Sequence, residues 1–153
     1  MKNTGTEQNA EQWIRDVYLP KEFGQPFHEK KLPLQSRGES KFAAVSDDGE
    51  VVASICVSRA YVSSGKVDKD ALLKVQSDAL KILWLENTPA KRLMLFTDPD
   101  MIRVIKEEKK KGHFPKEMEI VRVKLPAALE ARLEELRNRG SQNATAPDET
   151  PGK

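Results

Sequence analysis

Four carboxylates that lie close together near the middle of the chain could hold a divalent metal ion. They are Glu39, Asp47, Asp48 and Glu50. Carboxylate oxygens are the ligands that Mg²⁺ prefers, and a bound Mg²⁺ can activate water for the hydrolysis of a phosphodiester. The sequence Asp47-Asp48-Gly49 is also typical of a tight turn, in which aspartate side chains bond to the local backbone. We favour the turn, because solvated acids in turns are far commoner than metal sites.

Cys56 is the only cysteine in the chain, and its thiol could serve as a nucleophile or a metal ligand. The two histidines, His28 and His113, lie in stretches that we predict as loops, and they share no motif with it. A cysteine buried in an apolar strand behaves as a small hydrophobic residue. We therefore expect a structural role for Cys56 and no zinc site. A single cysteine cannot form an intramolecular disulfide bond, which indicates a reducing compartment.

A third group of residues could contact nucleic acid. Arg59, Tyr61 and Lys66 follow a strand-like run, and cations beside an aromatic ring suit a phosphate backbone and its bases. Gln76, in the next predicted helix, is a further polar candidate. The plainer interpretation is a mobile polar loop followed by the polar flank of a helix. A basic stretch at 106–116 has a similar explanation, since lysines in the last turn of a helix complement its dipole.

The positions of these residues depend on a predicted hairpin, which is the clearest local pattern. Two strand-like runs, KFAAVS (41–46) and EVVASICVS (50–58), flank the Asp-Gly turn. The second run consists almost entirely of small or β-branched residues, as expected of a strand that is covered on both faces. We therefore predict an antiparallel pair of strands here.

The segment before the hairpin is predicted to be a helix and then a loop. Apolar residues at helical spacing predict a helix over 7–19, which Pro20 ends. Glycine, proline and charged residues are frequent over 21–39. We predict mostly loop there, with a short strand around 32–35.

Beyond the hairpin, helices and strands are expected to alternate. Asp68 is a suitable N-cap for a helix to about residue 86, with an apolar face that Leu73, Leu80 and Trp84 widen. The later elements are a strand over 91–97, a capped helix from 98 to 112, a strand over 118–124 and a final helix from 126 to 140.

Length and composition agree with a single domain over residues 1–139 and a disordered tail over 140–153. The chain has 153 residues, of which 33% are charged and 38% apolar, and a formal net charge of +2. Such a domain can build its own core. The chain contains no apolar run long enough to span a membrane, and its first residues lack the apolar h-region of a signal peptide. We therefore expect a cytoplasmic protein without a membrane partner. Common nucleotide-binding and serine-hydrolase motifs are absent.

The predicted order of elements resembles the core of the restriction-endonuclease-like, or PD-(D/E)XK, superfamily over about residues 7–97. The segment KFAAVSDDGEVVASICVSRA is similar to the family segment in which an aspartate opens one hairpin strand and an acid-x-lysine motif lies in the next. The resemblance implies an α/β fold with a mixed sheet flanked by helices. In active members the two acids hold a divalent metal, usually Mg²⁺, and the lysine orients the nucleophile.

The residues at those chemical positions depart from the family pattern. Aligning the strands puts Ala43 at the aspartate, Ser54 at the acid and Cys56 at the lysine. Serine and a neutral thiol do not replace two carboxylates as ligands of Mg²⁺. Gln76 matches a glutamine that some members carry on the crossover helix, although Leu80 stands where their motif has tyrosine. The resemblance thus implies a nuclease fold without nuclease chemistry.

Three functional hypotheses follow. The first, which we favour, is a catalytically inactive nuclease-like domain that binds nucleic acid or another protein without a cofactor. The second is an active nuclease in which the four hairpin carboxylates hold Mg²⁺ from new positions. The third is a structural protein that self-associates through a sheet edge or through its final helix, whose apolar stripe consists of Leu129, Leu133 and Leu136.

Overall fold

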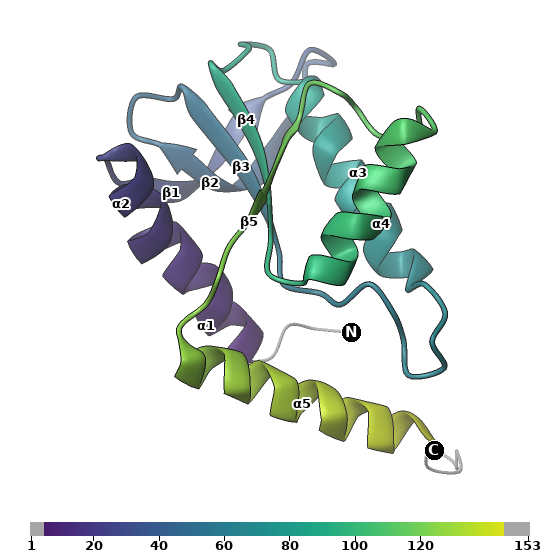
Figure 1. Cartoon of the computed structure of the whole chain (residues 1–153). Coiled ribbons are helices and arrows are strands. Elements are labelled where there is room, and N and C mark those ends of the chain that lie inside the picture. Colours follow the sequence, from purple (N-terminus) through teal and green to yellow (C-terminus); the bar gives the residue numbers. More distant parts are fainter. Residues whose placement is uncertain (1–4, 146–153) are drawn as a thin grey trace.

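The computed structural model describes residues 5–145 and, of these, the side chains of residues 5–136. Five strands form one mixed sheet with helices on both faces (Figure 1). In their order across the sheet they are β1 (Phe27–Pro33), β2 (Glu39–Ser46), β3 (Val51–Cys56), β4 (Lys91–Phe96) and β5 (Glu119–Arg122). β1, β2 and β3 are antiparallel neighbours, whereas β3, β4 and β5 run parallel. The predicted α/β class with a mixed sheet is confirmed.

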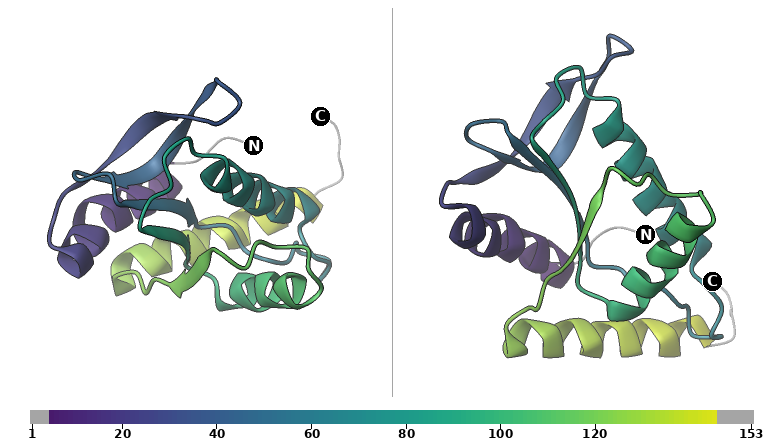
Figure 2. Two further views of the ribbon diagram at one scale, coloured as in Figure 1. Left: turned by 90° about the horizontal axis from the view of Figure 1, so that it is seen from above. Right: turned by 45° about the horizontal axis from the view of Figure 1, so that its top comes forward.

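Two helical layers cover the sheet (Figures 1 and 2). The first consists of α1 (Gly5–Trp13), the π-helical turn η1 (Ile14–Tyr18), α2 (Leu19–Phe23) and α5 (Ala127–Thr145), and the second of α3 (Lys69–Leu83) and α4 (Pro99–Lys110). β3 contributes to both cores, because Ala53 and Ile55 face the first layer and Val52 faces the second. The prediction that this strand is covered on both faces is confirmed.

The hairpin of β2 and β3 forms as predicted, with Gly49 in its turn at a φ of 74° that glycine adopts without strain. β2 also contains a bulge opposite β1. His28 pairs with Val45, and Lys30 pairs with Phe42, so β2 uses one residue more than β1 over this interval. A bulge of this kind bends its strand and increases the local twist.

The bulge lies at the point where β2 leaves β3. The two strands pair through Ala44 with Ala53 and through Val45 with Val52. On the far side of these pairs β2 continues beside β1, and the β1–β2 ribbon rises away from the rest of the sheet (Figure 2). The two strands therefore diverge in the middle of the sheet.

The first helical segment is longer than predicted, and the prediction that Pro20 ends it is wrong. The chain stays helical to Phe23, and Gly24 then ends the helix at a φ of 72°. In η1 the N–H of Leu19 reaches the carbonyl of Ile14, five residues back. This wider turn changes the hydrogen-bond register, so that Pro20 falls in the first turn of α2, where its missing N–H costs no hydrogen bond.

β1 is a full strand where we predicted mostly loop with a short strand around 32–35. It is an edge strand, with Phe27 buried and residues 28–31 exposed. Charged residues on both faces of an edge strand discourage pairing with other chains. They also remove the alternation of apolar and polar residues by which a strand is recognised in a sequence.

Both predicted N-caps are confirmed. The carboxylate of Asp68 accepts the N–H of Ala71 at 3.1 Å, and that of Asp98 accepts the N–H of Asp100 at 3.2 Å. The helices that they begin, α3 and α4, connect parallel strands, as crossover helices do.

The predicted apolar face of α3 is only partly correct. Val75, Ala79 and Ile82 are buried against the sheet, as expected. The predicted widening of this face is wrong, because Leu73, Leu80 and Trp84 lie on the solvent side of the helix and are exposed.

The final helix extends further than predicted, since α5 continues past Gly140 to Thr145. A glycine inside a helix costs about 1 kcal/mol relative to alanine, which is too little to end it. Residues 146–153 of the predicted disordered tail lie outside the described residues. Within the part of the chain that the structure describes, no helix combines the length and apolar character needed to cross a membrane.

Candidate functional site

A groove of about 860 Å³ opens where β2 and β3 diverge. Both strands line it, together with α1 from the first helical layer and α3 from the second. The loop that follows β3 supplies residues 57–59 and 61–63 of its lining. The bulge in β2 lies at this point of divergence, and a bulge bends the strand that contains it.

The three positions that depart from the nuclease pattern meet in this groove. Ala43 of β2 and both Ser54 and Cys56 of β3 line it. Two of the four nucleic-acid candidates, Arg59 and Tyr61, line it as well. The structure thus brings together five residues that sequence analysis singled out for different reasons.

The other two nucleic-acid candidates do not line the groove. The carbonyl of Lys66 accepts the N–H of Val62 at 2.9 Å within the loop before α3. The side-chain amide of Gln76 donates to the carbonyl of His113 at 3.3 Å. Lys66 therefore contributes to the shape of a loop, and Gln76 links α3 to the segment after α4.

Two of the hairpin acids serve the turn and its surroundings. One carboxylate oxygen of Asp48 accepts the hydroxyl of Ser46 at 2.7 Å and the N–H of Glu50 at 2.9 Å. The hydrogen bond from the N–H of Glu50, and next that from Ser46, hold the pKa of Asp48 below its usual value. The carboxylate of Glu50 accepts the N–H of Ala90 at 3.1 Å.

The remaining two acids of that set are far apart along β2. Asp47 follows the strand and lies 3.4 Å from the imidazole of His28. Glu39 begins the strand, where it pairs with Pro33. None of the four carboxylates lines the groove. Among the described residues, no group of three or more His, Cys, Asp or Glu side chains is placed to hold a metal ion.

Sequence reasoning missed two charged residues that α3 directs into the groove. The carboxylate of Asp78 accepts the hydroxyl of Ser54 at 3.1 Å and lies 3.2 Å from the ammonium of Lys74. An acid and a lysine from α3 thus stand beside the strand on which the family pattern has its own acid and lysine. Their i, i+4 spacing on the polar flank of the helix was the available signal.

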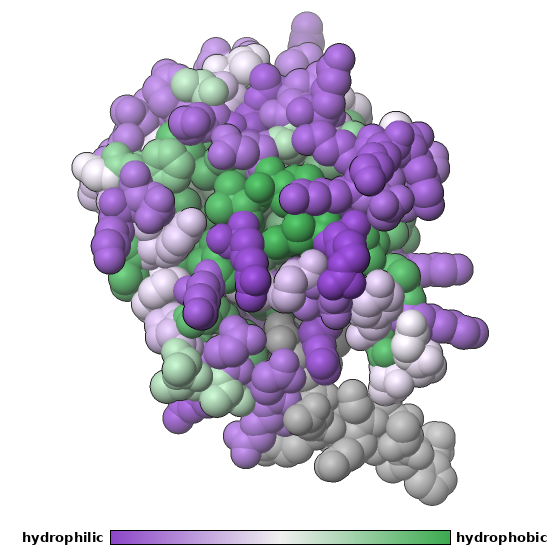
Figure 3. Space-filling view, in the orientation of Figure 1, coloured by the Kyte–Doolittle hydropathy of each residue, from purple (hydrophilic) through white to green (hydrophobic). Residues whose placement is uncertain are grey.

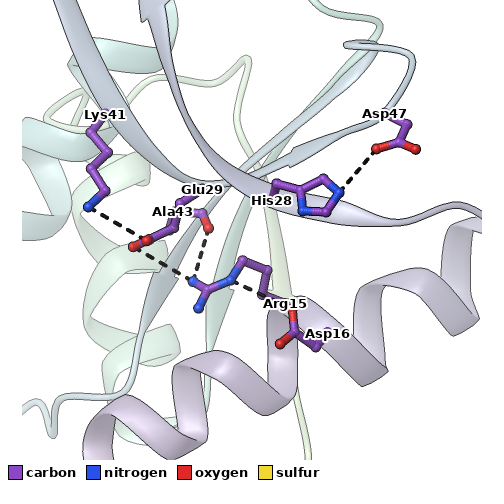
Figure 4. A network of polar contacts seen from close by, with 7 residues as sticks. All are labelled: Arg15, Asp16, His28, Glu29, Lys41, Ala43 and Asp47. Atoms are coloured by element: carbon purple, nitrogen blue, oxygen red, sulfur yellow. Dashed lines mark hydrogen bonds and ion pairs between the residues drawn. The ribbon is translucent and has the colours of Figure 1, made fainter.

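Arg15 supports the bulged wall of the groove (Figure 4). Its guanidinium donates to the carbonyl of Ala43 at 3.3 Å and lies 3.9 Å from the carboxylate of Glu29, which the ammonium of Lys41 approaches at 3.6 Å. The extra residue of a bulge has no ladder partner, so the side chain of Arg15 satisfies a carbonyl that the sheet leaves over. Arg15 is carried by η1, and π-helical turns are frequent at functional sites.

Cys56 has the properties of a structural cysteine. Burial raises the pKa of its thiol to about 11, and the nearby carboxylate of Asp78 adds to the rise. The thiol is therefore neutral at physiological pH, which makes it a poor nucleophile and a poor ligand for a hard cation. Neither His28 nor His113 lines the groove beside it.

The groove carries more negative than positive charge. Its carboxylates are those of Glu7, Glu11, Glu29, Asp68, Asp70 and Asp78, and its cations are Lys41, Arg59, Lys74 and Lys81. Arg59 also pairs with Glu134 of α5 at 3.8 Å. A nucleic-acid backbone is attracted by the opposite balance of charge. The groove is better suited to a ligand that carries positive charge.

The surfaces considered for self-association are partly used inside the domain. Leu133 is buried and Leu129 packs on the first core, so two leucines of the α5 stripe are already covered. β5 forms one edge of the sheet, with Ile120 and Val121 half-buried. Some apolar surface shows between charged side chains in the middle of the face seen in Figure 3.

Comparisons of the chain with protein-family models, with curated proteins and with solved structures found no match. The resemblance to the restriction-endonuclease-like superfamily therefore stays a prediction.

Proposed function

We propose that this chain is a non-catalytic binding domain on a nuclease-like scaffold, and that its groove binds an extended segment of a partner protein. One observation carries the proposal. Ala43, Ser54 and Cys56, none of which can replace a carboxylate as a ligand of Mg²⁺, line a groove that is still open with a volume of about 860 Å³.

The geometry of the diverging strands suits an extended peptide. β2 and β3 pair through Ala44 with Ala53 and through Val45 with Val52. Before Ala44 in β2 and after Ala53 in β3, the two strands no longer pair with each other. Extended peptides recognise open strand edges through main-chain hydrogen bonds, and alternate side chains enter pockets beside the strand. The excess of carboxylates in the lining favours a peptide with lysine or arginine side chains.

Selection from a displayed library of short random peptides tests the proposal. The dissociation constants of the selected peptides are measured by fluorescence anisotropy with the full chain and with two charge-reversal variants. Asp70→Lys changes an exposed residue of the groove, whereas Glu107→Lys changes an exposed residue of α4 outside it. We expect basic peptides whose affinity falls about tenfold with Asp70→Lys and is unchanged with Glu107→Lys. Peptides that respond equally to both variants would contradict a groove site.

Nucleic acid, the other partner class that the sequence suggested, is examined with the same protein. Labelled single- and double-stranded DNA and RNA are titrated at low and physiological salt with Mn²⁺ present. We expect no saturable binding, because the groove has the wrong sign of charge. Salt-sensitive binding of intact nucleic acid, strengthened by Asp70→Lys, would replace the peptide by nucleic acid as the ligand.

An active nuclease is the second candidate, and the placement of Asp78 and Lys74 beside Ser54 favours it. The metal would then be held by Asp78 with other carboxylates of the groove rather than by the hairpin acids. No preassembled set of three ligands exists among the described residues, so this candidate requires side chains to move. Denaturing gels of nucleic acid incubated with the chain and Mg²⁺ or Mn²⁺ test this candidate. Cleavage that Asp78→Asn abolishes would establish an active nuclease, whereas intact nucleic acid would rule it out.

A further inference from the structure

α3 and its C-cap residue Trp84 carry a second apolar stripe on the solvent side, formed by Leu73, Leu80 and Trp84 and called here the outer stripe. Their exposed fractions are 63%, 45% and 48%. The spacing i, i+7, i+11 places all three on one line along the helix, opposite the residues that pack on the sheet. A helix with apolar residues on two opposite faces is normally covered on both of them.

The outer stripe is where the exposed apolar side chains of this chain concentrate. The large apolar side chains that are exposed among the described residues are Val17, Tyr61, Val62, Leu73, Leu80 and Trp84. Tyr61 and Val62 line the groove, and Val17 stands alone on η1. Single exposed apolar residues are normal, whereas an aligned set marks a contact surface. No residue of the outer stripe lines the groove, whereas Lys74 and Lys81 beside it do, so the stripe and the proposed peptide site share that border.

The charges beside the outer stripe are mainly positive. Lys69, Lys74 and Lys81 are exposed on α3, and Asp70 is the exposed acid among them. Lys74 pairs with Asp78 at 3.2 Å, but the side chain of Asp78 is only 23% exposed and is directed to Ser54. A partner that covers the outer stripe therefore meets ammonium groups along its border and gains from carboxylates at those points.

The same charges argue against a second copy of this chain as the partner. In a two-fold, antiparallel pair of α3 helices joined through the outer stripe, the flank with Lys74 and Lys81 lies beside the same flank of the other copy. Lysine then faces lysine within one turn, which is repulsive. A different protein with acidic residues at these positions avoids this repulsion.

We infer that the outer stripe docks an amphipathic helix of a partner protein, whose apolar face covers Leu73, Leu80 and Trp84 and whose carboxylates border Lys74 and Lys81. An amphipathic helix binds another surface through apolar side chains at helical spacing, and the outer stripe provides apolar side chains at that spacing. The tryptophan at its end supplies the large, rigid contact that dominates many interfaces.

Two synthetic helical peptides test the inference. Both have the same leucine face, one with glutamate and the other with lysine on its flanks, and their binding to the full chain is measured by fluorescence anisotropy. We expect the glutamate peptide to bind about tenfold more tightly than the lysine peptide. Leu80→Ser is expected to weaken it about tenfold, and Lys81→Glu to remove most of the preference between the peptides.

Matched controls separate this surface from the rest of the chain. Val17→Ser removes an apolar side chain of the other helical layer whose exposed fraction, 48%, is close to the 45% of Leu80. We expect it to leave the binding of the peptides unchanged. Tyr61→Ala changes the groove and also leaves it unchanged, so failure here is distinct from failure of the groove proposal. Equal affinity for the two peptides, no saturable binding of either, or equal effects of Leu80→Ser and Val17→Ser would overturn the inference. A concentration-dependent dimer that Leu80→Ser disperses would overturn it as well, because the occupant would then be a second copy.

Discussion

Replacing Asp98 with alanine is expected to loosen the loop that carries Arg59 and Tyr61 into the groove. One carboxylate oxygen of Asp98 accepts the N–H of Asp100 at 3.2 Å and caps α4. The other accepts the N–H of Ala60 at 2.8 Å, and Ala60 is fully buried between the two groove residues. A single side chain therefore both begins a helix and anchors the loop beside the groove.

The two hydrogen bonds differ in what their loss costs. Removing an N-cap costs about 1 kcal/mol. Removing a charged acceptor from a buried N–H costs about 2 kcal/mol more, because the N–H of Ala60 is left without a partner and without water. We therefore expect Asp98→Ala to lower the free energy of unfolding by about 3 kcal/mol. Asp68→Ala, which removes a cap with one side-chain hydrogen bond to Ala71, is the matched control and is expected to cost about 1 kcal/mol.

Urea unfolding followed by circular dichroism measures both variants, and hydrogen exchange of the Ala60 amide reports the loop directly. Asp98→Asn keeps one acceptor oxygen and therefore one of the two hydrogen bonds, so its free energy of unfolding is expected to lie between those of the unchanged chain and Asp98→Ala. If Asp98→Ala and Asp68→Ala destabilise the chain equally, the hydrogen bond to Ala60 contributes nothing and the anchoring role is refuted. Unchanged exchange of the Ala60 amide in Asp98→Ala would refute it independently.

Three further outcomes are expected. The thiol of Cys56, whose pKa burial raises to about 11, should react with a disulfide reagent near pH 8 far more slowly in the folded chain than in urea, and equal rates would contradict the raised pKa. Asp48→Ala should destabilise the chain near neutral pH but not in strong acid. The pKa of Asp48 is lowered in the folded state, so its contribution is complete above about pH 4 and is lost as the pH falls through the lower, folded-state value; unfolding in urea at both pH values checks this. Leu133→Ala should cost about 3 kcal/mol, because that side chain is 1% exposed, and clearly more than the half-buried Leu136→Ala in the same urea assay.

Several local elements were predictable because their signals lie within a few neighbouring residues. The Asp-Gly turn, the cap at Asp68 and the cap at Asp98 are all confirmed. In each, a short side chain or a glycine satisfies backbone groups next to it, so the geometry is set by adjacent residues. β3 was recognised for a related reason, since a run of small and β-branched residues suits a strand that is buried on both faces.

Elements whose form depends on distant neighbours were predicted less well. Only the end of β1 was predicted as strand and the rest as loop, because an edge strand buries one face only weakly: Phe27 is buried, and residues 28–31 are exposed. The assignment of Leu73, Leu80 and Trp84 to the core failed because a helix with apolar residues all around has no unique inward face in its sequence.

The sequence by itself determined the class of fold, the hairpin, the caps, and the absence of carboxylates at Ala43, Ser54 and Cys56. Only the tertiary structure decided that these residues share a groove with Asp78. The physical reason is that β2 diverges from β3 beside its bulge, which leaves between the two strands a space that α3 also lines and from which Asp78 reaches Ser54. The short distance between Asp78 and Ser54 arises from the packing of α3 on the sheet. The order of residues along the chain does not indicate it.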